Sequence, residues 1–201
     1  MDPILLPGRE GALKWKQVFD AIPLEAQNRI CALVADNLQG MKLLAKYHRW
    51  ILQLCQFHLI LKLQVHRVRS RQRRALKGGQ SREKIYRLIC QSLEVQEGPK
   101  LDALLCELTQ LARLFCGTQR IQAVIRDFLI SIKYYRAYAL HPKLNLPTTT
   151  NTMESMGSVI RNLLHRNHCA STPKALIQWT TAFIRMRPEI ICNGKNINRI
   201  D

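Results

Sequence analysis

The run ICALVAD, residues 30–36, constrains the fold more than any other segment of this sequence. It is a continuous apolar run rich in strand formers, which is typical of a strand buried on both faces of a parallel sheet. A helix is expected next, over 38–49, and then a second buried strand, WILQLC, at 50–55. Strand, helix and strand at this spacing predict a parallel α/β unit, preceded by a helix at 11–22 and a short strand at 4–6.

The sequence after this unit changes to a helical pattern. Apolar residues recur with a period of 3.6 from about residue 56 to 140, as in Leu101, Leu104, Leu105 and Leu108. Turn-forming segments break this pattern and predict four helices, the breaks being KGGQS at 77–81, EGP at 97–99 and CGT at 116–118.

The last quarter of the chain is predicted to close the fold. It consists of a linker at 141–151, two helices at 152–166 and 173–187, and a flexible tail at 191–201. In the second of these helices, Trp179 and Phe183 are predicted to lie on an apolar core face. The expected fold class is therefore α/β with large helical content.

The charge of the chain points to an anionic partner. Thirty-one Lys and Arg against fourteen Asp and Glu give a net charge of +17, and nucleic acid is the partner that best offsets such a charge. No apolar run approaches the roughly 20 residues of a membrane-spanning helix, so no membrane partner is expected. The seven cysteines are odd in number and lie mostly in apolar runs, which favours a reducing cytoplasm over a disulfide framework.

Two acids stand alone in basic stretches. Asp36 is the only acid between Glu25 and Glu83, and Glu154 is the only acid between Asp127 and Glu189. Isolated carboxylates in such surroundings suit a divalent metal held near a phosphate backbone. Helix capping is an alternative role at both positions and, from spacing alone, the more common one. Asp36 could cap the following helix, and Thr150 or Asn151 with Glu154 is close to a capping box.

Helix geometry separates Glu154 from the core. The apolar face of the helix at 152–166 carries Met153, Met156, Val159, Ile160, Leu163 and Leu164. Glu154 falls on the opposite stripe with Ser158, Arg161 and His165. Glu154 is therefore expected to face a polar space, while Asp36 occupies the carboxyl end of a strand, where functional groups gather in open α/β sheets.

Three segments in order carry a resemblance to a known family. ICALVADNLQGM is followed nineteen residues after its Asp by CQFH, and after a long helical stretch by LPTTTNTMES. Together they resemble the catalytic core of Mutator-like DDE transposases, which are related to bacterial insertion-sequence enzymes. By this resemblance Asp36 corresponds to the second catalytic carboxylate and Glu154 to the third, while Cys55 and His58 match a Cys-x-x-His pair of the family.

The resemblance implies a fold and an activity. It implies a partial RNase H-like core with an all-α insertion, divided into core at 1–58, helical insertion at 59–145, closing helices at 146–190 and a flexible tail at 191–201. It implies DNA strand cleavage and transfer with Mg²⁺ (or Mn²⁺) held by Asp36 and Glu154, a homo-oligomeric intact enzyme, and a cytoplasmic, nucleoid-associated protein.

One part of the family pattern is missing from the sequence. The family's first catalytic Asp lies on the first strand of its sheet, and neither Asp2 nor Asp20 is placed to be that residue. We therefore expect a truncated fragment that does not cut DNA alone. The alternative is a non-catalytic basic DNA-binding protein derived from a transposase.

Cys55 and His58 allow two interpretations. A small buried thiol and a hydrogen-bonded histidine are ordinary at such positions, whereas the resemblance favours support of the active site. A zinc site would need two more ligands, for which His165, His168 and Cys169 are the candidates, but neither spacing is a complete zinc signature. We therefore do not expect zinc.

The densest positive run is HRVRSRQRRALK at 66–77. Its cations spread around a helix rather than along one stripe, which favours contacts with DNA phosphates over base recognition. A solvated charged face is the equally weighted alternative. The predicted DNA-binding residues are Arg67, Arg69, Arg71, Arg73, Arg74, Lys77 and Arg161.

Overall fold

The computed structural model describes residues 11–66, 79–114, 119–166, 172–186, 189–192 and 195–198. These residues are mostly helical and include a small two-stranded parallel sheet, as expected for an α/β fold with large helical content. The chain divides into two compact units. The first unit consists of Met1–Ile51 with Thr149–Asp201, and the second of Leu52–Thr148. The predicted strand at 4–6 lies outside the described residues.

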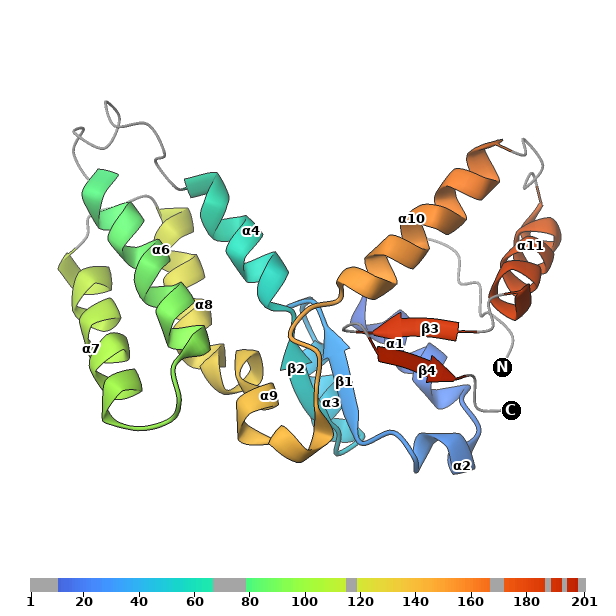
Figure 1. Cartoon of the computed structure of the whole chain (residues 1–201), viewed down its shortest axis with the longest axis horizontal. Helices are drawn as coiled ribbons and strands as arrows, with labels where there is room; N and C mark the ends of the chain where they lie inside the picture. Colours follow the sequence, from blue (N-terminus) through green and yellow to red (C-terminus); the bar gives the residue numbers. More distant parts are fainter. Residues whose placement is uncertain are drawn as a thin grey trace. The chain divides into compact units, whose positions relative to one another are not determined.

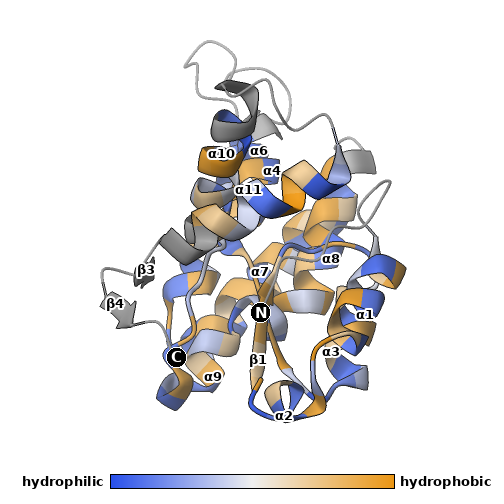
Figure 2. Cartoon of the chain, turned by 90° about the vertical axis from the view of Figure 1, so that its right-hand side faces the viewer, coloured by the Kyte–Doolittle hydropathy of each residue, from blue (hydrophilic) through white to orange (hydrophobic). Residues whose placement is uncertain are grey.

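The predicted strand, helix and strand are present, each shorter than expected (Figure 1). The amino-terminal part of the first unit contains α1 (Ala12–Asp20), α2 (Leu24–Gln27), β1 (Ala32–Ala35) and α3 (Met41–Tyr47). β1 pairs with β2 (Ile51–Leu54), and the boundary between the two units falls within β2. Figure 2 draws β1 in hydrophobic colours, in keeping with its sequence ALVA. The parallel α/β unit is confirmed, whereas a complete RNase H-like core stays a prediction.

An aromatic cluster forms the core of the first unit. Phe19, Met41, Leu44 and Trp50 are buried together, and Trp15 packs against them. The rings of Phe19 and Trp50 meet edge to face with centroids 5.0 Å apart, an arrangement that the quadrupoles of aromatic rings favour. This cluster packs α1 against α3, and Leu33 and Ala35 of β1 pack against it.

A close backbone approach fixes the loop between β1 and α3. Gly40 has φ of +92°, a left-handed conformation that side-chain-bearing residues adopt at a cost. A Cβ atom at this position would lie 2.4 Å from Cβ of Ala12, the first residue of α1. Only glycine therefore lets this loop turn against α1.

The carboxyl-terminal part of the first unit contains the two predicted closing helices, α10 (Asn151–Arg166) and α11 (Pro173–Met186), which contact each other. The core position predicted for Trp179 is wrong, because 48% of its surface is exposed. Phe183 is half-buried. Among the described residues α11 packs chiefly on α10. Because a single neighbouring helix covers only part of the apolar face of α11, Trp179 stays exposed.

Two strands overlap the segment predicted as a flexible tail. β3 (Glu189–Cys192) and β4 (Lys195–Asn198) pair antiparallel, with Ile190 opposite Ile197 and Cys192 opposite Lys195. Isoleucine is a strong strand former, and this preference favours strands at these positions.

The second unit is helical, as the 3.6-residue period predicts. It contains α4 (Gln56–His66), α6 (Gly79–Glu94), α7 (Pro99–Leu114), α8 (Gln119–Tyr135), the short α9 (Ala137–Leu140) and a 3₁₀ turn η1 (Pro142–Leu144). α6 packs against α4 and α7, and α8 packs against the same two helices. The backbone N–H of Gln56 donates to the carbonyl of Thr148 at 2.9 Å, so the two ends of this unit are hydrogen-bonded.

Buried polar groups join the parts of the second unit. Arg136 is 1% exposed, and its Nη1 donates to the Ser92 carbonyl at 2.5 Å. Its Nε donates to Glu97 Oε1 at 3.0 Å, and Nη2 forms an ion pair with the same oxygen at 2.9 Å. Gln53 in β2 is fully buried; its Nε2 donates to the Tyr135 carbonyl at 3.0 Å, and its Oε1 accepts from the Tyr138 N–H at 2.8 Å.

Among the described helices, none has both the length and the apolar character needed to cross a membrane.

Candidate functional site

Asp36 is the first residue after β1, and its side chain is exposed. The capping alternative for this residue is wrong, because α3 begins at Met41 with Gly40 as its N-cap and has no side-chain cap hydrogen bond. The position of Asp36 at the carboxyl end of a parallel strand is the one at which α/β folds place functional groups.

Glu154 is the fourth residue of α10 and is exposed. Its backbone N–H donates to the Thr150 carbonyl at 3.0 Å, which continues the helical bonding pattern. Its Oε1 accepts a hydrogen bond from the Thr150 hydroxyl at 2.7 Å. This side-chain bond differs from the predicted capping box, in which the carboxylate accepts from the backbone N–H of the cap residue.

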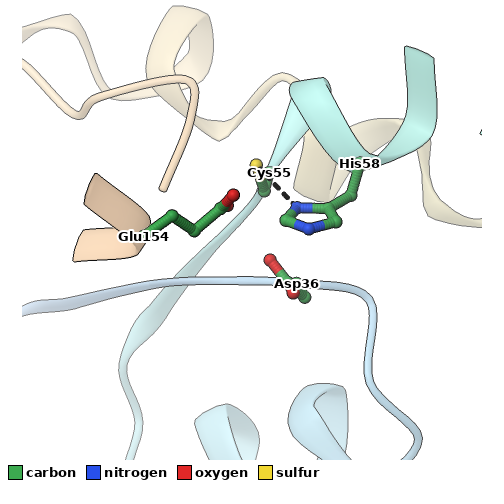
Figure 3. A group of neighbouring side chains, drawn as sticks. All are labelled: Asp36, Cys55, His58 and Glu154. Carbon is green, nitrogen blue, oxygen red and sulfur yellow. Dashed lines mark hydrogen bonds between the residues drawn. The ribbon is translucent and has the colours of Figure 1, made fainter. Parts of the chain in front are cut away.

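Thr150 links the two acids. Its Oγ1 lies 3.4 Å from Asp36 Oδ1, although the two residues are 114 positions apart along the chain. One carboxylate oxygen of Asp36 lies within 4.8 Å of one from Glu154. Figure 3 draws both side chains, Asp36 from the loop after β1 and Glu154 from α10. The two acids singled out in the sequence are thus brought together within the first unit.

The acid pair lies in a pocket of about 580 Å³, all of whose lining residues belong to the first unit. Its polar lining comes from Asp36, Thr150, Glu154 and Arg161. Its apolar lining includes Trp15, Phe19, Leu33, Met41 and Met153. The predicted polar stripe of α10 is thus represented at the pocket by Glu154 and Arg161. Met153, which was predicted on the apolar face of this helix, lines the pocket and is 58% exposed.

The donor atoms of this pair suit a hard divalent cation. Mg²⁺ and Mn²⁺ prefer carboxylate oxygen, and two oxygens that share one Mg²⁺ can lie at most about 4.2 Å apart, since each bond is about 2.1 Å. The two carboxylates are exposed, so small rotations of their side chains can satisfy this limit. Asp36 and Glu154 are therefore candidate metal ligands, and the identity of the ion is an expectation from their oxygen chemistry.

Cys55 and His58 form a separate pair in the second unit. Cys55 lies between β2 and α4 and is 1% exposed. Its Sγ lies 3.3 Å from Nδ1 of the half-buried His58, the contact drawn as a dashed line in Figure 3. The ring of His58 also meets that of Phe57 edge on, with centroids 5.6 Å apart. Sulfur and imidazole nitrogen are softer donors than Mg²⁺ prefers, so this pair is not expected to bind Mg²⁺, and its supporting role stays a prediction.

Several predicted residues lie outside the part of the chain that the structure describes. They are Arg67, Arg69, Arg71, Arg73, Arg74 and Lys77 of the basic run, and His168 and Cys169 of the alternative zinc set. His165 belongs to α10, but its side chain is also outside the description. Arg161 is the predicted DNA-binding residue that the structure describes, and it lies at the pocket of the two acids.

The sequence pointed to Thr150 only as a helix cap. The hydrogen bond from its hydroxyl to the Glu154 carboxylate was not predicted, because capping patterns describe bonds to the backbone at the start of a helix. Its contact with Asp36 was not predicted either, because local spacing carries no information about a residue 114 positions away. The signal that could have found it is the position of Thr150 four residues before an isolated acid.

Comparison of the chain with protein-family models, curated proteins and solved structures yields no match. The resemblance to transposases therefore stays a prediction from the sequence.

Proposed function

We propose that this chain is part of the catalytic domain of a Mutator-like DDE transposase, in which Asp36 and Glu154 hold Mg²⁺ or Mn²⁺ against the backbone of DNA. The observation that carries the proposal is the meeting of the two acids at Thr150. They are the same two acids that the sequence marks by their isolation and by their order in the family pattern. If exposed acids were placed at random, there would be no reason for the pair marked by the sequence to be the pair that meets at Thr150.

The surroundings of the acids support a phosphate-bearing substrate. Arg161 lies at the same pocket, where its guanidinium group can contact a DNA phosphate. The net charge of +17 offsets the repulsion that two carboxylates exert on a polyanion. Mg²⁺ held by Asp36 and Glu154 would supply Lewis-acid activation of an attacking hydroxyl and stabilisation of the leaving oxygen in phosphodiester transfer.

The roles of the residues follow from this arrangement. Asp36, at the end of β1, provides oxygen ligands from the sheet, and Glu154 provides them from α10. Within the described lining of the pocket these are the only acids, whereas the family pattern has three. We therefore expect the chain alone to bind DNA and a divalent ion but not to cut DNA.

A second function remains in a different class. A basic DNA-binding module without catalysis is favoured by the same net charge and needs no metal. The two functions differ in whether Asp36 and Glu154 bind an ion.

Binding of Mn²⁺ to the purified chain, followed by electron paramagnetic resonance, tests the proposal. We expect one ion to bind, and Asp36→Asn or Glu154→Gln to weaken binding by more than about tenfold. Glu25→Gln removes an exposed acid in α2 and serves as the matched control, with wild-type affinity expected. DNA binding is measured on the same samples by fluorescence anisotropy.

Two outcomes would contradict the proposal. A wild-type chain that binds DNA but no Mn²⁺ would favour the non-catalytic module. Mn²⁺ binding that Asp36→Asn and Glu154→Gln leave unchanged would place the ion elsewhere and remove the argument for a catalytic site.

A further inference from the structure

Thr150 holds Glu154 by two bonds. Its carbonyl accepts from the backbone N–H of Glu154 at 3.0 Å, and its hydroxyl donates to Glu154 Oε1 at 2.7 Å. The first bond fixes the start of α10, and the second fixes the end of the side chain. A glutamate side chain has several freely rotating bonds, so a fixed carboxylate loses less entropy when it binds an ion.

The hydroxyl also faces Asp36 but has one proton to donate. The distance to Glu154 Oε1 is 2.7 Å and that to Asp36 Oδ1 is 3.4 Å, so the proton belongs to the bond with Glu154. The hydroxyl oxygen therefore lies between the two carboxylates, and its proton engages one oxygen of Glu154.

We propose that Thr150 is a positioning residue that orients the carboxylate of Glu154 for a divalent cation shared with Asp36. This inference rests on the proposed function. Thr150 acts through Glu154 and is not itself a ligand. Its branched β-carbon restricts rotation about χ1 and keeps the hydroxyl in place.

The experiment measures Mn²⁺ affinity in two conservative variants. Thr150→Val keeps the shape of the side chain but lacks the hydroxyl, and we expect it to weaken Mn²⁺ binding by about tenfold, a size typical of groups that orient metal ligands. Thr150→Ser keeps the hydroxyl, and we expect it to bind close to wild type. Thr149→Val makes the same chemical change one residue earlier and is the matched control, with wild-type affinity expected.

A double-mutant cycle separates positioning from a general structural effect. Because Thr150 acts through Glu154, Thr150→Val should cause no further loss of Mn²⁺ affinity in the Glu154→Gln background. Far-UV circular dichroism of each variant checks that α10 and the rest of the chain are folded.

The outcomes distinguish this inference from the proposed function. If the wild type binds Mn²⁺ and Thr150→Val binds it equally well, the positioning role is wrong while the metal site stands. Loss of affinity in Thr150→Ser equal to that in Thr150→Val, or an additional loss in the Glu154→Gln background, would also overturn it. If the wild type binds no Mn²⁺, the proposed function fails first and the inference fails with it.

Discussion

The two units of the chain use polar side chains in opposite ways. The second unit buries Arg136 and Gln53 and bonds them to carbonyl groups and to Glu97. The first unit keeps Asp36 and Glu154 exposed and joins them through one hydroxyl. A buried polar group must be bonded in place and therefore stabilises the fold, whereas an exposed acid pair costs little to hold and can exchange its partner for an ion. The buried polar groups of the second unit therefore belong to the scaffold, whereas the exposed acids of the first unit form the candidate site.

Replacement of the buried Arg136 should have the largest effect on the free energy of unfolding. Arg136→Met leaves the Ser92 carbonyl without this donor and removes the ion pair with Glu97, and we expect a loss of about 3–4 kcal/mol in the free energy of unfolding. Urea unfolding followed by far-UV circular dichroism measures the loss. Arg126→Met, which changes an exposed arginine of α8, is the control and should stay within about 0.5 kcal/mol of wild type.

The tryptophans make the same experiment specific to one unit. All three, Trp15, Trp50 and Trp179, belong to the first unit. We expect Arg136→Met to lower the unfolding midpoint seen by circular dichroism more than the midpoint seen by tryptophan fluorescence. An equal shift of both would show that the two units unfold together, and the contrast between them would not extend to stability.

The corresponding test in the first unit is Gly40→Ala. The added Cβ would lie 2.4 Å from Ala12 Cβ at a φ of +92°, and we expect a loss of about 2–3 kcal/mol, seen chiefly by tryptophan fluorescence. Gly157→Ala in α10 is the control, because its Cβ would meet Arg161 Nη1 at an ordinary 3.7 Å. Alanine favours a helix interior, so this control should be stabilised by roughly 0.5–1 kcal/mol. Equal destabilisation by both changes would contradict the close approach at Gly40.

The smallest effect is expected at the exposed pair of Lys16 and Asp20 on α1. A hydrogen bond from Lys16 to Asp20 raises the pKa of Lys16 above its ordinary value of 10.5. The stabilisation is therefore complete below that value and is lost as the pH rises through the raised pKa. Because the pair is solvated, Lys16→Met should lower Tm by about 1 °C or less at neutral pH, and high salt should remove the difference. A difference in Tm that persists in high salt would show that the contact of Lys16 Nζ with the Tyr47 ring, whose centroid lies 5.0 Å away, matters more than the solvated pair with Asp20.

Local patterns predicted the elements of this fold well. The apolar run at 30–36 became β1, and the 3.6-residue period with its breaks gave α6, α7 and α8 close to their observed bounds. These features depend on residues near each other in sequence. The separation of Asp36 and Glu154 from other acids was also visible, because composition along the chain requires no knowledge of the fold.

Features that depend on distant partners were not predictable. The apolar pattern predicted a core position for Trp179 and an apolar-face position for Met153, but whether such a face is covered depends on which other elements reach it. The burial of Arg136 depends on carbonyl groups of Ser92 and Leu93 at the end of α6, more than forty residues away along the chain. The approach of Thr150 to Asp36 was not predictable either, because the two residues are 114 positions apart along the chain.

The hydrogen bond from the Gln56 N–H to the Thr148 carbonyl bears on the order in which the parts of the chain fold during synthesis. It closes the helical unit on itself, so every contact within that unit is available once residue 148 has left the ribosome. The carboxylate pair can form only after α10 has been synthesised, more than a hundred residues later than β1 and Asp36. We therefore expect the helices of the second unit to fold during translation. The acid site should assemble afterwards, as one of the last long-range contacts that the nascent chain forms.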